Sequence, residues 1–127
     1  MSALIDSNTV ALLSLALDAT SLRHQAIAHN IANANTPGYK PVGVSFEERM
    51  TEVRSALEQG KSPSLASLGD YRPRLEFESG NGFGDDKVAL DTEVAKLSEN
   101  TLHHQALLKA LNRHFSIISA AINEGKR

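Results

Sequence analysis

The chain contains five histidines, the side chains most often used for general acid-base chemistry and metal binding near neutral pH. His24 and His29 are five residues apart and do not share a helix face, and the adjacent His103 and His104 point apart. No carboxylate joins either pair at metal-ligand spacing, and the H-E-x-x-H pattern is absent. Because there is no cysteine, a disulfide framework, a thiolate zinc site and a cysteine nucleophile are excluded. We therefore expect no metal site.

Other reactive residue types also lack a recognisable setting. The glycine-rich run 80–84 has neither the preceding apolar strand and following helix of a dinucleotide-binding loop nor a Walker lysine. The acidic pairs Glu47-Glu48 and Asp85-Asp86 lie in polar stretches, where solvated charge is the ordinary state. No nucleophile elbow is present, although one sequence leaves a dispersed Ser-His-Asp set open. We expect no catalytic residue and no cofactor; a small hydrolase using a histidine and a carboxylate is the enzymatic alternative.

Composition bounds the class of protein. With 127 residues the chain is expected to form one unit, and 13 basic against 15 acidic residues argue against a nucleic-acid partner. Nothing indicates a small-molecule substrate. All four prolines lie between residues 37 and 73, and seven of the eight glycines lie between residues 38 and 84. The chain therefore divides into two terminal thirds suited to helices and a punctuated middle.

The first third has apolar and small residues at alternating steps of three and four, which is one helix face. This pattern predicts a helix over residues 8–34, with Ser7 or Asn8 as N-cap. Thr36-Pro37-Gly38-Tyr39 should stop it, since Pro and Gly suit the central positions of a type II turn.

The last third repeats the pattern from Leu90 to Ile122 and predicts a helix over residues 91–124, capped by Asp91. Between them, residues 46–58 predict a short helix, 59–70 a loop, 72–78 a short strand, and 80–84 a flexible connection. The predicted fold is mainly α. Its long N- and C-terminal helices pair as an antiparallel coiled-coil-like hairpin, beside a middle segment made of a short helix, loops and a short strand. Residues 1–39 and 88–127 would form a terminal helical assembly domain, and residues 40–87 a central segment.

The apolar stripes predict which side chains pack between the two helices. The stripe residues are Leu13, Leu17, Ile27, Ile31, Leu97, Leu108, Leu111, Phe115 and Ile118. His24 and His104, beside Thr20 and Thr101, are expected to form a polar layer that sets the register. The opposite faces are nearly uncharged and rich in Ala, Ser and Asn, which suits packing against neighbouring copies or partners. An ordinary three- or four-helix bundle, with the middle segment covering these faces, is the alternative.

One segment carries a family resemblance. Residues 22–39, with Asn30-Ile-Ala-Asn33 and Asn35-Thr-Pro-Gly-Tyr39 at their heart, resemble the N-terminal signature of bacterial flagellar rod, hook and related axial proteins. Residues 88–100, 105–108 and 110–115 are similar to the short proximal-rod branch of that family. A second short rod protein shares this layout and is one alternative. A free-standing helical adaptor or export chaperone is another.

The resemblance implies a structural subunit and not an enzyme. It implies terminal helices that pack into the wall of a helical tube, the rod, which crosses the periplasm as a drive shaft. It also implies export through the flagellar type III apparatus without a cleaved signal peptide, and none is visible in the sequence. The implied partners are other rod subunits, further copies of the chain, the basal adaptor with the membrane-ring base, and the export apparatus.

The resemblance also points to an assembly motif within residues 30–39. Its members are Asn30, Asn33, Asn35, Thr36, Pro37, Gly38 and Tyr39. We expect Asn30 and Asn33 to hydrogen-bond backbone groups at the turn or to reach another helix, with simple helix capping as the alternative. Tyr39 is expected to pack at the turn.

Overall fold

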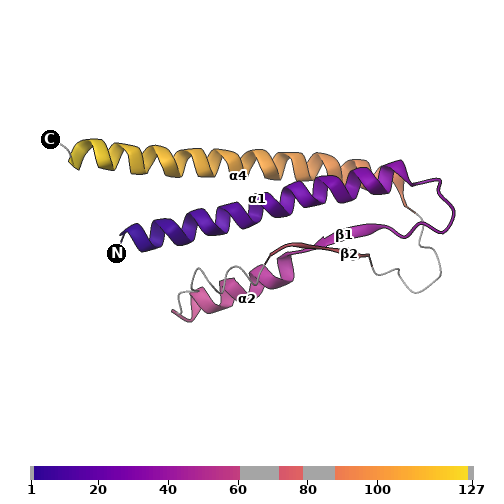
Figure 1. Cartoon of the computed structure of the whole chain (residues 1–127), viewed down its shortest axis with the longest axis horizontal. Helices are drawn as coiled ribbons and strands as arrows, with labels where there is room; N and C mark the ends of the chain where they lie inside the picture. Colours follow the sequence, from indigo (N-terminus) through magenta and orange to yellow (C-terminus); the bar gives the residue numbers. More distant parts are fainter. Residues whose placement is uncertain (1, 61–71, 79–87, 126–127) are drawn as a thin grey trace.

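A computed structural model describes residues 2–60, 72–78 and 88–125. These residues form a long helix α1 (Ser2–Ala32), a strand β1 (Val42–Ser45), a helix α2 (Glu47–Glu58), a strand β2 (Arg74–Phe77) and a long helix α4 (Leu90–Gly125) (Figure 1). The prediction of a mainly helical chain with long terminal helices, a short middle helix and a short strand is confirmed. The expected loop and glycine-rich connection fall largely or wholly outside the described residues.

The starts of both long helices differ from the prediction. Helix α1 already includes Ser7 and Asn8, so neither is its N-cap. Residues 2–8 contain neither Pro nor Gly, so nothing in them stops the helix from extending toward the N-terminus. The carbonyl of Ala89 accepts the Glu93 N–H at 3.0 Å, which leaves Asp91 inside the first turn of α4. There its carboxylate complements the helix dipole instead of capping the helix.

The turn after α1 is confirmed. The Tyr39 N–H donates to the Thr36 carbonyl at 3.2 Å, and Gly38 has φ of 76°. This is the geometry of a type II turn with Pro37 and Gly38 at its centre. The turn reverses the chain and delivers it directly into β1.

Strand β1 is absent from the sequence prediction, since its four residues include a glycine and follow a turn closely. It pairs antiparallel with β2, from Val42 opposite Phe77 to Ser45 opposite Arg74. The Glu78 N–H extends this pairing by donating to the Pro41 carbonyl at 2.9 Å. The strand is therefore stabilised by partners 29 to 35 residues further along the chain, which no local pattern reveals.

The main apolar cluster lies between α1 and the middle segment. Leu15 and Ala19 of α1 pack with Phe46, which precedes α2, and Val44 and Met50 pack around them. The middle segment thus covers one side of α1. None of the described helices is long and apolar enough to span a membrane.

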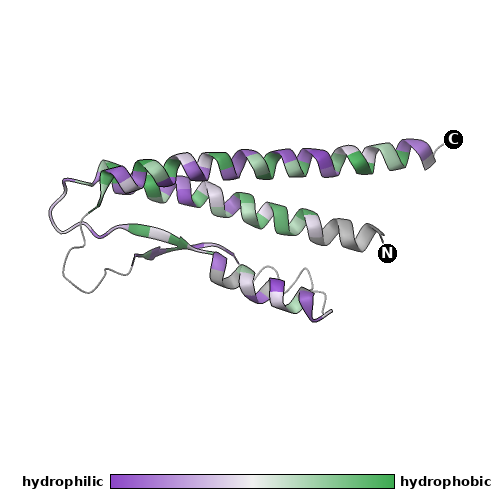
Figure 2. Cartoon of the chain, turned by 180° about the vertical axis from the view of Figure 1, so that it is seen from behind, coloured by the Kyte–Doolittle hydropathy of each residue, from purple (hydrophilic) through white to green (hydrophobic). Residues whose placement is uncertain are grey.

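Helices α1 and α4 lie side by side and run in opposite directions (Figures 1 and 2). They are close near the C-terminal end of α1 and diverge toward its N-terminal end, where α4 extends further. The side chains of α4 that are buried or half-buried recur at steps of four and three. They are Glu93, Leu97, Asn100, His104, Leu107, Leu111, His114 and Ile118, with Lys96 half-buried beside Leu97.

This set corrects part of the predicted stripe. Ile27 is buried, and Leu13, Leu17, Ile31, Leu97, Leu111 and Ile118 are half-buried, as the stripe requires. Leu108 and Phe115, in contrast, keep 40% and 50% of their surface exposed. Positions 107 and 114 take the places that the prediction assigned to 108 and 115, and Asn100 takes the place of Thr101. Helix α4 is therefore rotated by part of a turn relative to the predicted packing face.

Candidate functional site

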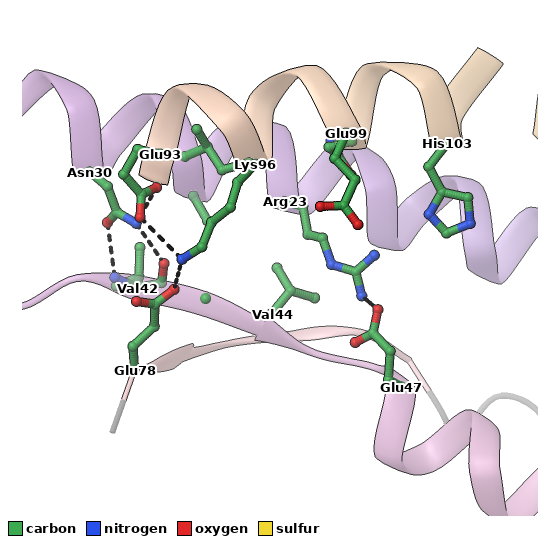
Figure 3. A pocket seen from close by; sticks show the side chains of 14 residues that line it. Arg23, Asn30, Val42, Val44, Glu47, Glu78, Glu93, Lys96, Glu99 and His103 are labelled. Carbon is green, nitrogen blue, oxygen red and sulfur yellow. Dashed lines mark hydrogen bonds and ion pairs between the residues drawn. The ribbon is translucent and has the colours of Figure 1, made fainter. Parts of the chain in front are cut away.

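A groove of about 460 Å³ lies between α1, α4 and β1. Charged side chains stand at both ends of it, and Val44 lies between them (Figure 3). At one end Arg23 of α1 forms an ion pair with Glu47 at the start of α2. Burial lowers the pKa of Arg23, while the nearby charge of Glu99 acts in the opposite direction. This end thus links α1 to the middle segment.

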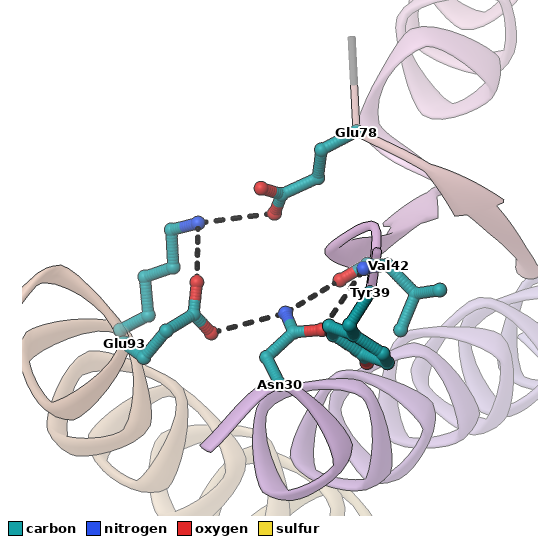
Figure 4. Close-up of polar contacts among 6 residues, drawn as sticks. Asn30, Tyr39, Val42, Glu78 and Glu93 are labelled. Carbon is teal, nitrogen blue, oxygen red and sulfur yellow. Dashed lines mark hydrogen bonds and ion pairs between the residues drawn. The ribbon is translucent and has the colours of Figure 1, made fainter. Parts of the chain in front are cut away.

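The other end of the groove is centred on Asn30, which is 1% exposed. Its amide nitrogen donates to the Val42 carbonyl at 2.9 Å and to Glu93 Oε2 at 3.2 Å. Its amide oxygen accepts from the Val42 N–H at 2.9 Å and from the Tyr39 hydroxyl at 2.8 Å (Figure 4). Two donors and two acceptors are the full capacity of an asparagine side chain. We call Asn30 with these three partners the Asn30 node.

The node uses Asn30 as a substitute for a neighbouring strand. In the β1–β2 ladder, the Pro41 carbonyl points toward β2, so by alternation both backbone groups of Val42 point away from β2. The Asn30 side-chain amide hydrogen-bonds to both of these backbone groups of Val42, as a neighbouring strand would. One side chain of α1 therefore fixes the position of β1 and satisfies part of its outer edge.

Glu93 links the Asn30 node to α4. It is 3% exposed, and its second oxygen accepts from Lys96 Nζ at 3.2 Å. Lys96 also donates to Glu78 Oε1 at 3.0 Å. Burial acts to lower the pKa of Lys96, but the hydrogen bonds and charges of Glu78 and Glu93 outweigh it, and the pKa is raised. The buried carboxylate is thus compensated by one amide and one ammonium group.

Tyr39 links the turn to the same node. Burial raises the pKa of its hydroxyl, and the negative charges of Glu93 and Glu78 raise it further. The hydroxyl therefore stays protonated at neutral pH and keeps its hydrogen for Asn30. At the turn, where the sequence predicts that Tyr39 packs, its contact is this hydrogen bond to Asn30.

The other members of the predicted motif lie outside the node. Asn33 donates to the His29 carbonyl at 2.9 Å and accepts from the Thr36 hydroxyl at 3.2 Å, so it caps the end of α1. Of the two roles left open for the asparagines, Asn30 takes the tertiary one and Asn33 the capping one. Asn35, Thr36, Pro37 and Gly38 are exposed around the turn.

A second polar contact joins α1 and α4 ten residues before the node. Thr20 Oγ1 lies 2.7 Å from His104 Nδ1 and donates to the Leu17 carbonyl at 2.8 Å. The tautomer of His104 determines which of the two groups donates in this contact. Asn100 donates to the Thr20 carbonyl at 2.8 Å. The expected polar layer thus consists of Thr20, Asn100 and His104, while His24 and Thr101 are exposed.

The charged and polar side chains that line the groove neutralise one another and hydrogen-bond to one another. Its buried carboxylate and its amide have partners within the chain, as the bonds above show. Across the described ranges, no three His, Asp or Glu side chains come together as a metal site would require. The sequence reading missed Glu93, Lys96, Glu78 and Asn100. The available signal was that residues 93, 97, 100 and 104 alternate steps of four and three, a pattern that polar residues at 93 and 100 conceal.

Comparisons with known proteins give this arrangement a context. Residues 13–40, which contain Asn30 and the turn, match a family model described as flagella basal body rod protein. A protein of Buchnera aphidicola subsp. Baizongia pistaciae is 33% identical over 80% of this chain and 85% of its own length. A Bacillus subtilis protein is 29% identical over 94% of this chain and 97% of its own length. An Escherichia coli K12 protein is 28% identical over 76% of this chain and 80% of its own length.

The chain belongs to the flagellar basal-body rod protein family, a family of structural components and not of enzymes. All three relatives bear the name flagellar basal body rod protein FlgB. The prediction of a rod subunit related to the short proximal-rod branch is confirmed. Its location is the flagellar basal body.

Proposed function

We propose that this rod subunit polymerises through its terminal helices, and that α1 and α4 work as one antiparallel, coiled-coil-like hairpin in the proximal part of the axial drive shaft. The observation that supports this most directly is the Asn30 node. Its central residue, Asn30, lies inside the segment that matches the rod family and bonds α1 to both β1 and α4. Residues 1–39 and 88–127 then form the assembly domain, and residues 40–87 a central brace against α1.

The distribution of charge supports a role in close packing. Between Thr9 and Pro37 the only charged residues are Asp18 and Arg23, and Arg23 is already paired with Glu47. Helix faces of Ala, Ser, Thr and Asn let helices approach closely with little desolvation of charge. A shaft that transmits torque needs extensive and rigid contacts, and such faces supply them.

The position in the cell and the partners follow from the same proposal. The chain is exported through the flagellar type III apparatus without a cleaved signal peptide and becomes part of a rod that crosses the periplasm. It contacts further copies of itself, other rod subunits, and the adaptor at the membrane-ring base. The assembly motif, Asn30 with Asn33, Asn35 and the Thr36–Tyr39 turn, holds the hairpin in the form that these contacts require.

Electron microscopy of basal bodies from a strain that lacks this chain tests the proposal. We expect rods to be missing from their base outward, and to return when the unmodified chain is supplied in trans. Ile31→Asp, at a half-buried position of α1, should fail to restore them, whereas Gln59→Asp, at an exposed position after α2, should succeed. Intact rods in the deletion strain would show that the chain is an accessory helical protein, such as an adaptor or export chaperone.

A further inference from the structure

Strand β1 contains a glycine at a position where its backbone does not require one. Gly43 lies outside the left-handed region, which among the described glycines is adopted by Gly38 and Gly60. Glycine inside a strand weakens it, and its benefit there is that another group can approach the backbone closely. A Cβ added at Gly43 would lie 3.2 Å from Cγ of Glu78 and 3.3 Å from its Oε1, which is tighter than ordinary van der Waals contact. Gly43 is therefore the place where the Glu78 side chain passes β1.

The Glu78 side chain extends past β1 toward helix α4 (Figure 3). Its backbone continues the β1–β2 ladder, since its N–H donates to the Pro41 carbonyl at 2.9 Å. Its Oε1 accepts from Lys96 Nζ of α4 at 3.0 Å. The oxygen that a Cβ at Gly43 would meet is thus the same oxygen that binds Lys96. A side chain at position 43 would displace that oxygen from the ion pair.

This ion pair completes a series of polar contacts that passes through four elements. Lys96 also donates to Oε1 of Glu93 at 3.2 Å, and Oε2 of Glu93 accepts from Asn30. Asn30 in turn binds both backbone groups of Val42, which precedes Gly43 in β1. In order, the residues of the series are Glu78, Lys96, Glu93, Asn30, Val42 and Gly43. The β1–β2 sheet is thereby joined to α1 at one side of the series and to α4 at the other.

We infer that Glu78 and Lys96 form a strap that ties the β1–β2 sheet to α4, and that position 43 is glycine so that the strap can cross β1. The strap makes the docking of the sheet and the docking of α4 depend on each other. It is a property of the single chain, so it is independent of the proposed assembly into a rod.

Exposure makes the strap sensitive to ionic strength. The side chains of Lys96 and Glu78 are 40% and 39% exposed, whereas the side chain of Glu93 is 4% exposed. Salt screens exposed ion pairs strongly, with a Debye length of about 3 Å at 1 M, and it screens buried groups much less. High salt should therefore release the strap while the bond between Asn30 and Glu93 stays formed.

The sign of one substitution tests whether the strap crosses β1 at Gly43. If nothing crossed there, Gly43→Ala would stabilise the chain, because alanine loses less backbone entropy than glycine in a strand. With the strap in place, the added methyl group displaces Glu78 Oε1, and the substitution destabilises the chain. Urea unfolding of the full chain at low salt, followed by circular dichroism, measures the midpoint that distinguishes the two cases.

The other end of the groove offers a matched control. Glu47 also forms an ion pair across the groove, with Arg23, but the three atoms nearest to a Cβ at Gly43 all belong to Glu78. We expect Gly43→Ala to lower the urea midpoint in the native chain and in the Glu47→Ala background. In the Glu78→Ala background, where nothing crosses β1, the same substitution should raise it.

A second measurement tests the connection to α4. The double-mutant cycle of Glu78→Gln and Lys96→Met should show a coupling of roughly 1.5- to 5-fold in the unfolding equilibrium at low salt, as expected for an exposed ion pair. In 1 M NaCl the coupling should vanish. Lys96→Met should also reverse the sign of Gly43→Ala, since Glu78 is then free to turn toward solvent.

Three results would overturn the strap. A higher midpoint for Gly43→Ala in the native chain would show that Glu78 does not constrain position 43. An equal loss in the native and Glu78→Ala backgrounds would assign the effect of the methyl group to another neighbour. A cycle without coupling at low salt would show that Glu78 and Lys96 do not tie the sheet to α4. Because each readout comes from the isolated chain, none of these results bears on whether the chain builds rods.

Discussion

Replacement of Asn30 by alanine should be among the most destabilising single changes in α1. The substitution removes four hydrogen bonds from a side chain that is 1% exposed. The two backbone groups of Val42 should lose about 1 kcal/mol each, and the Glu93 carboxylate about 1.5 kcal/mol, since its bond is charge-assisted. The Tyr39 hydroxyl can turn toward water and should lose little. The sum is about 3–4 kcal/mol, or roughly a 150- to 850-fold change in the unfolding equilibrium.

Urea unfolding followed by circular dichroism measures this loss, with Asn33→Ala as the matched control. Asn33 is half-buried, and its amide makes one bond to the helix end and accepts one from the Thr36 hydroxyl, so its loss should cost about 0.5–1 kcal/mol. An unchanged slope against urea would show that both variants unfold from the same compact state. Equal losses for the two alanine variants would refute the assignment of the tertiary role to Asn30.

Three further changes test the turn and the charges. Gly38→Ala meets no neighbouring atom within 4 Å but must adopt φ near 76°, so it should cost about 1 kcal/mol, whereas Gly125→Ala should cost nothing in the same unfolding assay. Because the pKa of Lys96 is raised above 10.5, its stabilisation is present at lower pH and is lost as pH rises through the raised value. The stability difference between the native chain and Lys96→Met should thus be constant at neutral pH and shrink only in strong alkali; shrinkage near neutrality would contradict the ion pairing. The pKa of Tyr39 is raised above 10.0, so ultraviolet titration should show a late phenolate component that Tyr39→Phe abolishes. Persistence of that component in Tyr39→Phe would assign it to another group.

The parts of the fold that sequence could predict are those governed by local rules. Helical periodicity located both long helices, because side-chain spacing of three and four is a property of the segment itself. The Pro37-Gly38 turn was predictable for the same reason, since glycine at the third position permits positive φ. The family signature pointed to Asn30, but it did not reveal what the side chain binds.

The partners of Asn30 depend on chain segments that meet only after folding. Strand β1 is stable because β2 pairs with it and because Asn30 completes its other edge. Glu93 comes from a helix 63 residues further along the chain. A four-residue segment with no stabilising pattern of its own, and a carboxylate among many, give no local signal of these contacts. Periodicity within each segment therefore determined the helices, whereas contacts between distant segments determined the site.

The same reasoning explains why the C-terminal stripe was misplaced. Hydrophobic periodicity selects the most apolar line on a helix, which on α4 runs through Leu108 and Phe115. The structure instead turns Glu93 and Asn100 toward α1, where one binds Asn30 and the other the Thr20 carbonyl. Both polar side chains gain a partner on α1, although Asn100 Oδ1 is buried without a hydrogen bond, and the apolar line is displaced to the flank. The chain thus keeps the contacts of Glu93 and Asn100 with α1 and leaves Leu108 and Phe115 40% and 50% exposed.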